Sequence, residues 1–104
     1  MRYEKEFRQL IDTWGEEPQI LITIEELSEL SQALCKYLRV KANVEKLPKE
    51  EHQEKVQKNL YNVKEEIADV LNCVKQMVLI FGHDDIYKIR EQKVKRAMKR
   101  LEGK

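Results

Sequence analysis

Glycine, proline and cysteine are scarce in this sequence of 104 residues, which contains three glycines, two prolines and two cysteines. A chain with so few glycines and prolines has few breaks in regular structure, which favours long helices. Cys35 and Cys73 stand in separate apolar segments without a CxxC spacing. They predict reduced thiols, packed as small core residues of a cytoplasmic protein, rather than a disulfide framework.

An excess of one charge and a long apolar run are also missing. The 20 Lys and Arg residues nearly balance the 19 Asp and Glu residues, so net charge gives no argument for a nucleic acid polymer as partner. No apolar run approaches the roughly 20 residues of a membrane-spanning helix, and the first ten residues are amphipathic and contain acids, unlike a signal peptide. We expect one domain over residues 1–104, in the cytoplasm, with no membrane partner.

The few breaks divide the chain into four helical segments. Gly15 follows Trp14, Pro48 lies in a polar connection, and Gly82 ends an apolar run in the way that glycines end helices. The helices are expected at residues 3–14, 17–41, 50–81 and 84–101. Short links between helices predict an all-α fold resembling an antiparallel four-helix bundle.

Apolar residues recur at helical spacing in the two central segments. In the second helix the main apolar seam is Ile20, Ile24, Leu27, Leu34 and Leu38, and a mixed stripe holds Ile22, Leu30, Ala33, Tyr37 and Val40. In the third helix the principal seam is Val56, Leu60, Val63, Ile67, Val70, Val74, Val78 and Phe81. The main seams are expected to form the core. A lone bundle would leave part of the long apolar arc of the third helix exposed, which predicts self-association.

Carboxylates interrupt both apolar segments. Glu25, Glu26 and Glu29 lie in the sequence IEELSEL, and Glu66 and Asp69 lie in EEIAD. On a helical wheel Glu26 and Glu29 point along the mixed stripe, and Glu66 and Asp69 project near apolar residues. Such strings usually mark a solvated helix face with supporting ion pairs. Two of them on adjacent helices, both among apolar residues, favour a functional site.

Several ionised carboxylates buried together lose hydration and repel one another, and a divalent cation offsets both costs. An acidic pair three residues apart on each of two helices offers four oxygen ligands. Oxygen ligands favour Mg²⁺, with Mn²⁺ as a substitute. His52 and His83 lie outside both acidic motifs, which argues against a di-iron site built from Glu-x-x-His pairs.

The residues EELSE at 25–29 and EIAD at 66–69 resemble the E-E-x-x-E and E-x-x-D signature of the MazG-like all-α nucleoside triphosphate pyrophosphohydrolases. The resemblance covers most of the chain, including a first helix that ends in WG and a basic last helix. It implies Mg²⁺-dependent cleavage of a nucleoside triphosphate to the monophosphate and pyrophosphate, by a homodimer or homotetramer. It further implies that Glu26, Glu29, Glu66 and Asp69 are the metal ligands.

Other candidate site residues have two interpretations each. Glu25 is a group that orients or deprotonates water, or a partner in a surface salt bridge. Asn72 contacts metal-bound water or ribose, or is solvated. The resemblance implies that the basic pair Lys93 and Arg96 contacts phosphate. Alternatively, the two residues are there because the helix dipole favours basic side chains near a helix C-terminus. Trp14 stacks on the base, or packs in a core or interface.

Two alternative functions stay open. One is a non-catalytic helical module for oligomerisation or regulation, with the acids as interface ion pairs. The other keeps the site but acts on phosphoribosyl-ATP, as a related hydrolase does. The long polar insertion at 42–61 is expected either to extend the third helix as a contact arm or to reshape the nucleotide pocket.

Overall fold

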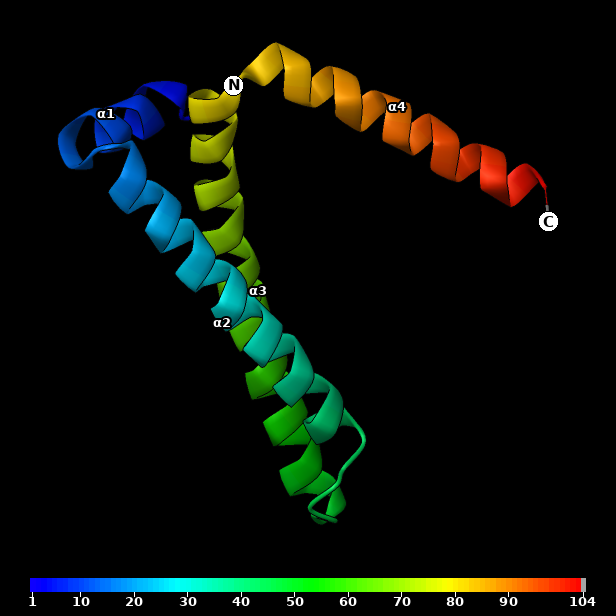
Figure 1. Ribbon diagram of the computed structural model, residues 1–104. Helices are drawn as coiled ribbons and strands as arrows, with labels where there is room; N and C mark the ends of the chain where they lie inside the picture. The colour runs from blue at the N-terminus through cyan, green and yellow to red at the C-terminus, as the bar shows by residue number, and fades with distance from the viewer. Residues whose placement is uncertain (104) are drawn as a thin grey trace.

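The computed structural model describes residues 1–103, which form four α-helices joined by short links (Figure 1). The helices are α1 (Glu4–Trp14), α2 (Glu16–Lys41), α3 (Lys49–Phe81) and α4 (His83–Glu102). The described residues contain no strand, so the all-α prediction is confirmed, and every predicted helix end lies within one residue of the observed end. Within this described part, no helix combines the length and the apolarity needed to cross a membrane.

Glycines set two of the three changes of direction. Gly15 lies between α1 and α2 with φ of 97°, and Gly82 lies between α3 and α4 with φ of 117°. This backbone region is strained for residues that carry a Cβ atom and accessible to glycine. The Gly82 N–H donates a hydrogen bond to the carbonyl oxygen of Val78 at 3.0 Å, which closes the last turn of α3.

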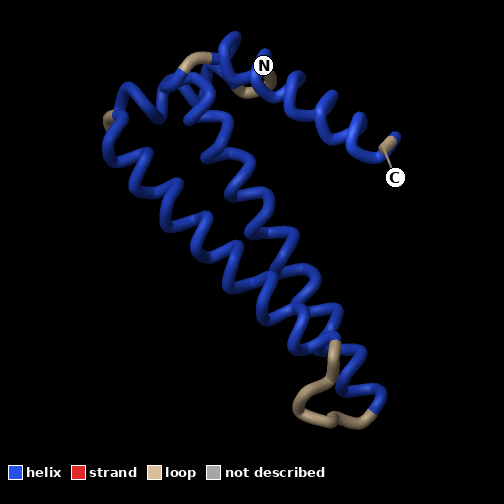
Figure 2. The backbone as a smooth tube through the Cα atoms, turned by 45° about the vertical axis from the view of Figure 1, so that its right-hand side comes forward, coloured by secondary structure: helices blue, strands red, loops and turns tan. Residues whose placement is uncertain are grey.

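Helices α2 and α3 form an antiparallel hairpin and lie side by side along most of their lengths (Figures 1 and 2). Asn43 organises the link between them: its amide donates to the Leu47 carbonyl at 3.1 Å, and its side-chain oxygen accepts from the Leu47 N–H at 2.9 Å. Pro48 then precedes the first turn of α3. A ring nitrogen of His52 lies 2.8 Å from the Val40 carbonyl and ties the two helices together beside the link.

The face of α2 that packs against α3 holds most of the mixed stripe, but not Ile22, which is exposed. Its inward positions recur about every 3.5 residues and are buried or half-buried: Gln19, Thr23, Glu26, Leu30, Ala33, Tyr37 and Val40. The predicted main seam of α2 is largely exposed, with exposed fractions of 58% for Ile24 and 64% for Leu38. The prediction that this seam forms the core is therefore wrong for the single chain.

The principal seam predicted for α3 is divided in the same way. Val63 and Val78 are buried, whereas Ile67, Val74 and Phe81 are exposed. On each helix the exposed apolar positions follow the inward positions by one residue, or about 100° of rotation. Because α2 and α3 run antiparallel, that rotation brings both exposed sets to the same side of the hairpin. Apolar residues of both helices therefore share one uncovered face.

Polar contacts fill the hairpin at the end nearest α1. The Gln19 amide donates to the Gln76 side-chain oxygen at 2.7 Å, and both side chains are buried. The Thr23 hydroxyl donates to the Gln19 carbonyl at 2.9 Å. The acidic residues Glu26 and Glu66 therefore continue a polar section of the hairpin.

Helix α4 leads away from the corner at Gly82 and, within the described part of the chain, contacts only α3 (Figure 1). Its apolar residues Val94, Met98 and Leu101 are more than half exposed. The radius of gyration is 18.2 Å, whereas a compact domain of about 100 residues has one of about 13 Å. The helices of residues 1–103 therefore do not close into a four-helix bundle within a single chain.

Candidate metal centre

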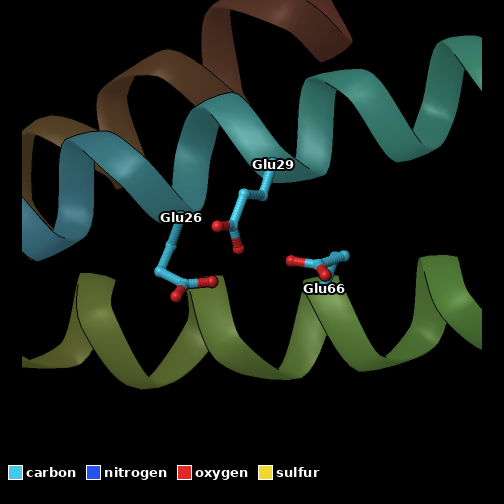
Figure 3. A group of neighbouring side chains, drawn as sticks. All are labelled: Glu26, Glu29 and Glu66. Atoms are coloured by element: carbon cyan, nitrogen blue, oxygen red, sulfur yellow. The ribbon is translucent and has the colours of Figure 1, made fainter.

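The acidic motifs of α2 and α3 meet in the middle of the hairpin. Glu26 and Glu29 reach from α2, and Glu66 reaches from α3, into the space between the helices (Figure 3). One carboxylate oxygen from each of the three lies within 4.8 Å of the others. The two motifs that were predicted to form one site therefore lie next to each other, and Glu26, Glu29 and Glu66 are their closest side chains.

Two of these carboxylates have buried oxygens without partners. One oxygen each of Glu26 and Glu66 is shielded from solvent and makes no hydrogen bond. A buried carboxylate oxygen in this state lacks the stabilisation that a donor or a cation supplies. The unpartnered oxygens and the all-oxygen donor set fit a hard divalent cation such as Mg²⁺ or Mn²⁺.

The surroundings raise the pKa of both carboxyls. For Glu26 the largest cause is loss of hydration, followed by repulsion from Glu29, Asp69 and Glu66. For Glu66 loss of hydration again comes first, followed by repulsion from Glu29, Asp69 and Glu65. The repulsion shows that Asp69 adds its charge to the cluster, although its oxygen is outside the closest group of three.

No basic side chain among residues 1–103 offsets this charge by an ion pair. The salt bridges of the described chain involve the acids Glu4, Glu45, Asp84 and Glu91, and none involves the acidic motifs. Strings of acids on a helix ordinarily form ion pairs with basic residues of the same helix. The acidic motifs form no such pairs within the described part of the chain.

Cys73 borders the cluster from α3. Burial raises the pKa of its thiol, and the charges of Glu26 and Asp69 raise it further, while a hydrogen bond with Thr23 lowers it. The side chain is buried, as predicted for a small core residue, whereas Cys35 is exposed and the prediction for it is wrong. A thiol whose pKa is raised stays protonated, so Cys73 adds no charge beside the carboxylates.

The remaining predicted residues are more dispersed. Glu25 is exposed beside Glu26, and Asn72 follows Asp69 by one turn of α3 and lines a cavity with Lys75 and Tyr87. Sequence reasoning missed Lys75, although its position three residues after Asn72 continues the same ridge of the helix. It also missed Glu65, whose charge acts on Glu66.

Three predicted substrate contacts are not brought to the carboxylates within this chain. Trp14 is 65% exposed at the end of α1. Lys93 and Arg96 are exposed on α4, which contacts neither α1 nor α2 among the described helices. Comparison with protein-family models, with curated proteins and with solved structures finds no match for this chain. The functional argument therefore rests on the geometry and on the motifs.

Proposed function

We propose that this chain is a Mg²⁺-dependent nucleoside triphosphate pyrophosphohydrolase, which releases a nucleoside monophosphate and pyrophosphate. The observation that carries the proposal is the convergence of Glu26, Glu29 and Glu66 from two helices, with two buried oxygens left without partners. The resemblance of the two motifs to the MazG-like signature supplies the reaction. Mn²⁺ is an alternative ion for the same oxygen ligands.

Each acidic residue has a role in this proposal. Glu26, Glu29, Glu66 and Asp69 would hold the ion, which would supply positive charge against the phosphate groups of the substrate. The oxygen of a water molecule bonds to the α-phosphorus as the bond from that phosphorus to the bridging oxygen breaks. Pyrophosphate leaves with the electron pair, and the carboxylate of Glu25 accepts the proton of the water.

We further propose that the protein works as a homodimer or homotetramer in which a second copy completes the helical bundle. The uncovered apolar residues on one side of the hairpin form the contact, and we call them the apolar face: Ile24, Leu27, Leu34, Leu38, Ile67, Leu71 and Val74. Uncovered apolar residues gathered on one side of a helical hairpin are typical of association surfaces. Association also offers Lys93 and Arg96 a site in a partner chain.

The test is an assay of ribo- and deoxyribonucleoside triphosphates, with and without Mg²⁺, in which products are separated by ion-exchange chromatography. We expect Mg²⁺-dependent release of monophosphate and pyrophosphate. The variant Glu66→Gln should lower turnover at least about 100-fold, because it removes a charged oxygen ligand of the ion that stabilises the transition state. Glu54→Gln, an exposed acid on the same helix, is the matched control.

The alternative functions predict other results. Full turnover by correctly folded Glu66→Gln would refute the assignment of the site. Cleavage of phosphoribosyl-ATP alone would keep the site and change the substrate. A folded oligomer that neither binds Mg²⁺ nor cleaves any of these compounds would favour the non-catalytic module.

A further inference from the structure

A small cavity lies at the link between α2 and α3, at the end of the hairpin away from α1 (Figure 1). We call it the link cavity. Its volume is about 180 Å³, and its walls come from the last turns of α2, the link and the first two turns of α3. Sites for drug-sized ligands measure about 300–1,000 Å³, so the link cavity is too small for a nucleotide. At about 30 Å³ per water molecule, it has room for a ligand the size of about six waters.

Cations outnumber acids among the described residues that line the link cavity. Lys36 and Arg39 of α2 and Lys55 of α3 contribute the cations, and Glu45 contributes the single carboxylate. Glu45 forms an ion pair with Lys55. Lys36 and Arg39 form no ion pair with any residue of the described chain. The link cavity therefore has two cations whose charge no neighbouring acid offsets.

These two cations are neighbours on α2. Lys36 and Arg39 are three residues apart, so their side chains lie on one side of the helix. A guanidinium can donate two parallel N–H bonds to the two oxygens of a carboxylate, and an ammonium can add another donor. The helix dipole accounts for Arg39, which lies in the last turn of α2, but not for Lys36, which lies before that turn. The pair is therefore suited to bind an oxyanion.

The rest of the wall is largely apolar. Val40, Val44 and Leu47 line the link cavity, and Val44 is 66% exposed. A ligand with a hydrocarbon part would remove some of this apolar surface from water, which stabilises the bound state. The apolar wall therefore favours an organic anion over an inorganic one.

The link has a fixed shape without a ligand. Asn43 and Lys46 have φ of 54° and 57°, in the left-handed region that residues with a Cβ atom rarely adopt. Two hydrogen bonds between Asn43 and Leu47 hold this conformation, and the ion pair of Glu45 with Lys55 joins the link to α3. Non-glycine residues in this region occur most often at functional sites such as ligand clamps. A wall that is formed in advance also lowers the entropy that binding costs.

We propose that the link cavity binds a short-chain organic carboxylate. Arg39 and Lys36 contact the carboxylate group, and the apolar wall contacts the hydrocarbon chain. Arg39 lies ten residues beyond Glu29, about 15 Å along the axis of α2. The ligand is therefore separate from the triphosphate, and the site goes beyond the proposed function. Because the ligand contacts the folded link and not the unfolded chain, its binding stabilises the hairpin.

The experiment is a titration of ¹⁵N-labelled protein with butyrate, followed by the chemical shifts of the backbone amides. Butyramide, an uncharged molecule of the same shape, is the control ligand. We expect butyrate, and not butyramide, to shift the amide signals of Val40, Val44 and Leu47. Arg39→Met should weaken butyrate binding about 10-fold or more, the usual effect of losing hydrogen bonds to a charged group.

Arg100→Met is the matched control variant. Arg100 also lies in the last turn of a helix, so its replacement removes the same charge from the same position relative to a helix dipole. Butyrate binding by Arg100→Met should equal that of the unaltered protein.

The apolar wall is tested with Val44→Ser, which removes hydrocarbon at an exposed position. This variant should weaken the binding of butyrate more than the binding of inorganic phosphate. Thermal unfolding verifies that each variant is folded, and butyrate should raise the unfolding midpoint of the unaltered protein more than butyramide does.

The outcomes separate this proposal from the proposed function. Equal shifts with butyramide, or equal weakening by Arg39→Met and Arg100→Met, would overturn the contact with the carboxylate. Binding of inorganic phosphate alone would overturn the organic ligand. Competition of butyrate with the triphosphate in the Mg²⁺-dependent assay would overturn the separation of the two sites. Butyrate binding that depends on Arg39, in a protein without turnover, would support the link cavity and refute the proposed function, and turnover without butyrate binding would do the reverse.

Discussion

At the scale of single residues, Glu26 and Glu66 combine burial with mutual repulsion. Each has an oxygen that neither water nor a donor reaches, and each lies in the field of neighbouring carboxylates. The ionised forms are therefore less stable in the folded protein than in the unfolded chain, where water surrounds every carboxylate. This difference couples stability to pH and, through the ion that we propose, to divalent cations.

The first prediction concerns pH in the absence of metal. Because the pKa values of Glu26 and Glu66 are raised above the ordinary 4.5, the folded protein keeps these protons to higher pH than the unfolded chain does. The free energy of unfolding should therefore fall as pH rises above about 4.5, until the folded carboxyls have also ionised. Urea unfolding of metal-free protein at a series of pH values measures this.

The matched comparison is Glu66→Gln, which removes one of the titrating groups and part of the repulsion. Its free energy of unfolding should fall less over the same pH interval, and Mg²⁺ should stabilise it less at neutral pH. Identical pH dependence in the two proteins would show that the shielded carboxyls do not couple to folding.

The helices themselves were predictable because their ends are marked by single residues. Gly15, Pro48 and Gly82 are local signals, and the predicted ends of all four helices lie within one residue of those observed. The packing faces were less predictable. Two stripes with the same period lie side by side on α2, and apolarity alone selects the one with Ile24 and Leu38, which the hairpin leaves exposed. The position of α3 decides which stripe of α2 is buried. The spacing of apolar residues along α2 does not reveal that position.

The candidate site was also predictable only in part. Glu26, Glu29 and Glu66 were predictable because spacing along a helix fixes which side chains share a face. The contact between Lys75 and Tyr87 was not predictable, because these residues become neighbours only through the angle between α3 and α4. That angle arises at one residue with positive φ, and it also carries Lys93 away from the carboxylates.

The corner between α3 and α4 gives a second prediction, at the scale of elements. Gly82→Ala places a Cβ atom on a residue with φ of 117°, although the nearest other atom, an oxygen of Asp85, leaves space at 3.9 Å. The cost is therefore in the backbone, and we expect a loss of about 1 kcal/mol or more in the free energy of unfolding.

Thermal unfolding at a fixed protein concentration measures this loss as a shift of about 4–8 °C per kcal/mol. Gly103→Ala is the control, because Gly103 has φ of −77° and needs no unusual backbone conformation. Equal stability of Gly82→Ala and Gly103→Ala would mean that the corner adapts without strain.

For the whole molecule, the main feature is its extended shape. The described chain measures 50 × 45 × 21 Å and leaves apolar residues uncovered on α2, α3 and α4. Burial of apolar surface stabilises association by about 25 cal/mol per Å² before the costs of ordering and of lost freedom. A second copy is the partner that we propose for the apolar face.

The third prediction tests that face. Leu27→Glu introduces a charge among its apolar residues, which would have to be buried at the contact, so we expect sedimentation velocity to show a monomer where the unaltered protein is a dimer or tetramer. Leu21→Glu is the control, because Leu21 is 61% exposed but lies outside the apolar face. A monomeric unaltered protein, or assembly that persists in Leu27→Glu, would contradict the proposal.

The hairpin also predicts an order of events during folding. Contacts beside the Asn43 link join residues close in sequence, such as His52 and Val40, which are 12 residues apart, whereas Gln19 and Gln76 at the other end are 57 apart. The entropy lost on closing a chain segment grows with its length, so we expect pairing to begin beside the link and to proceed away from it. The carboxylates, near the middle, come together only after the half of the hairpin beside the link has formed. The ion that we propose would therefore bind only after that half of the hairpin has formed, and it would oppose separation of the helices at their middle during unfolding.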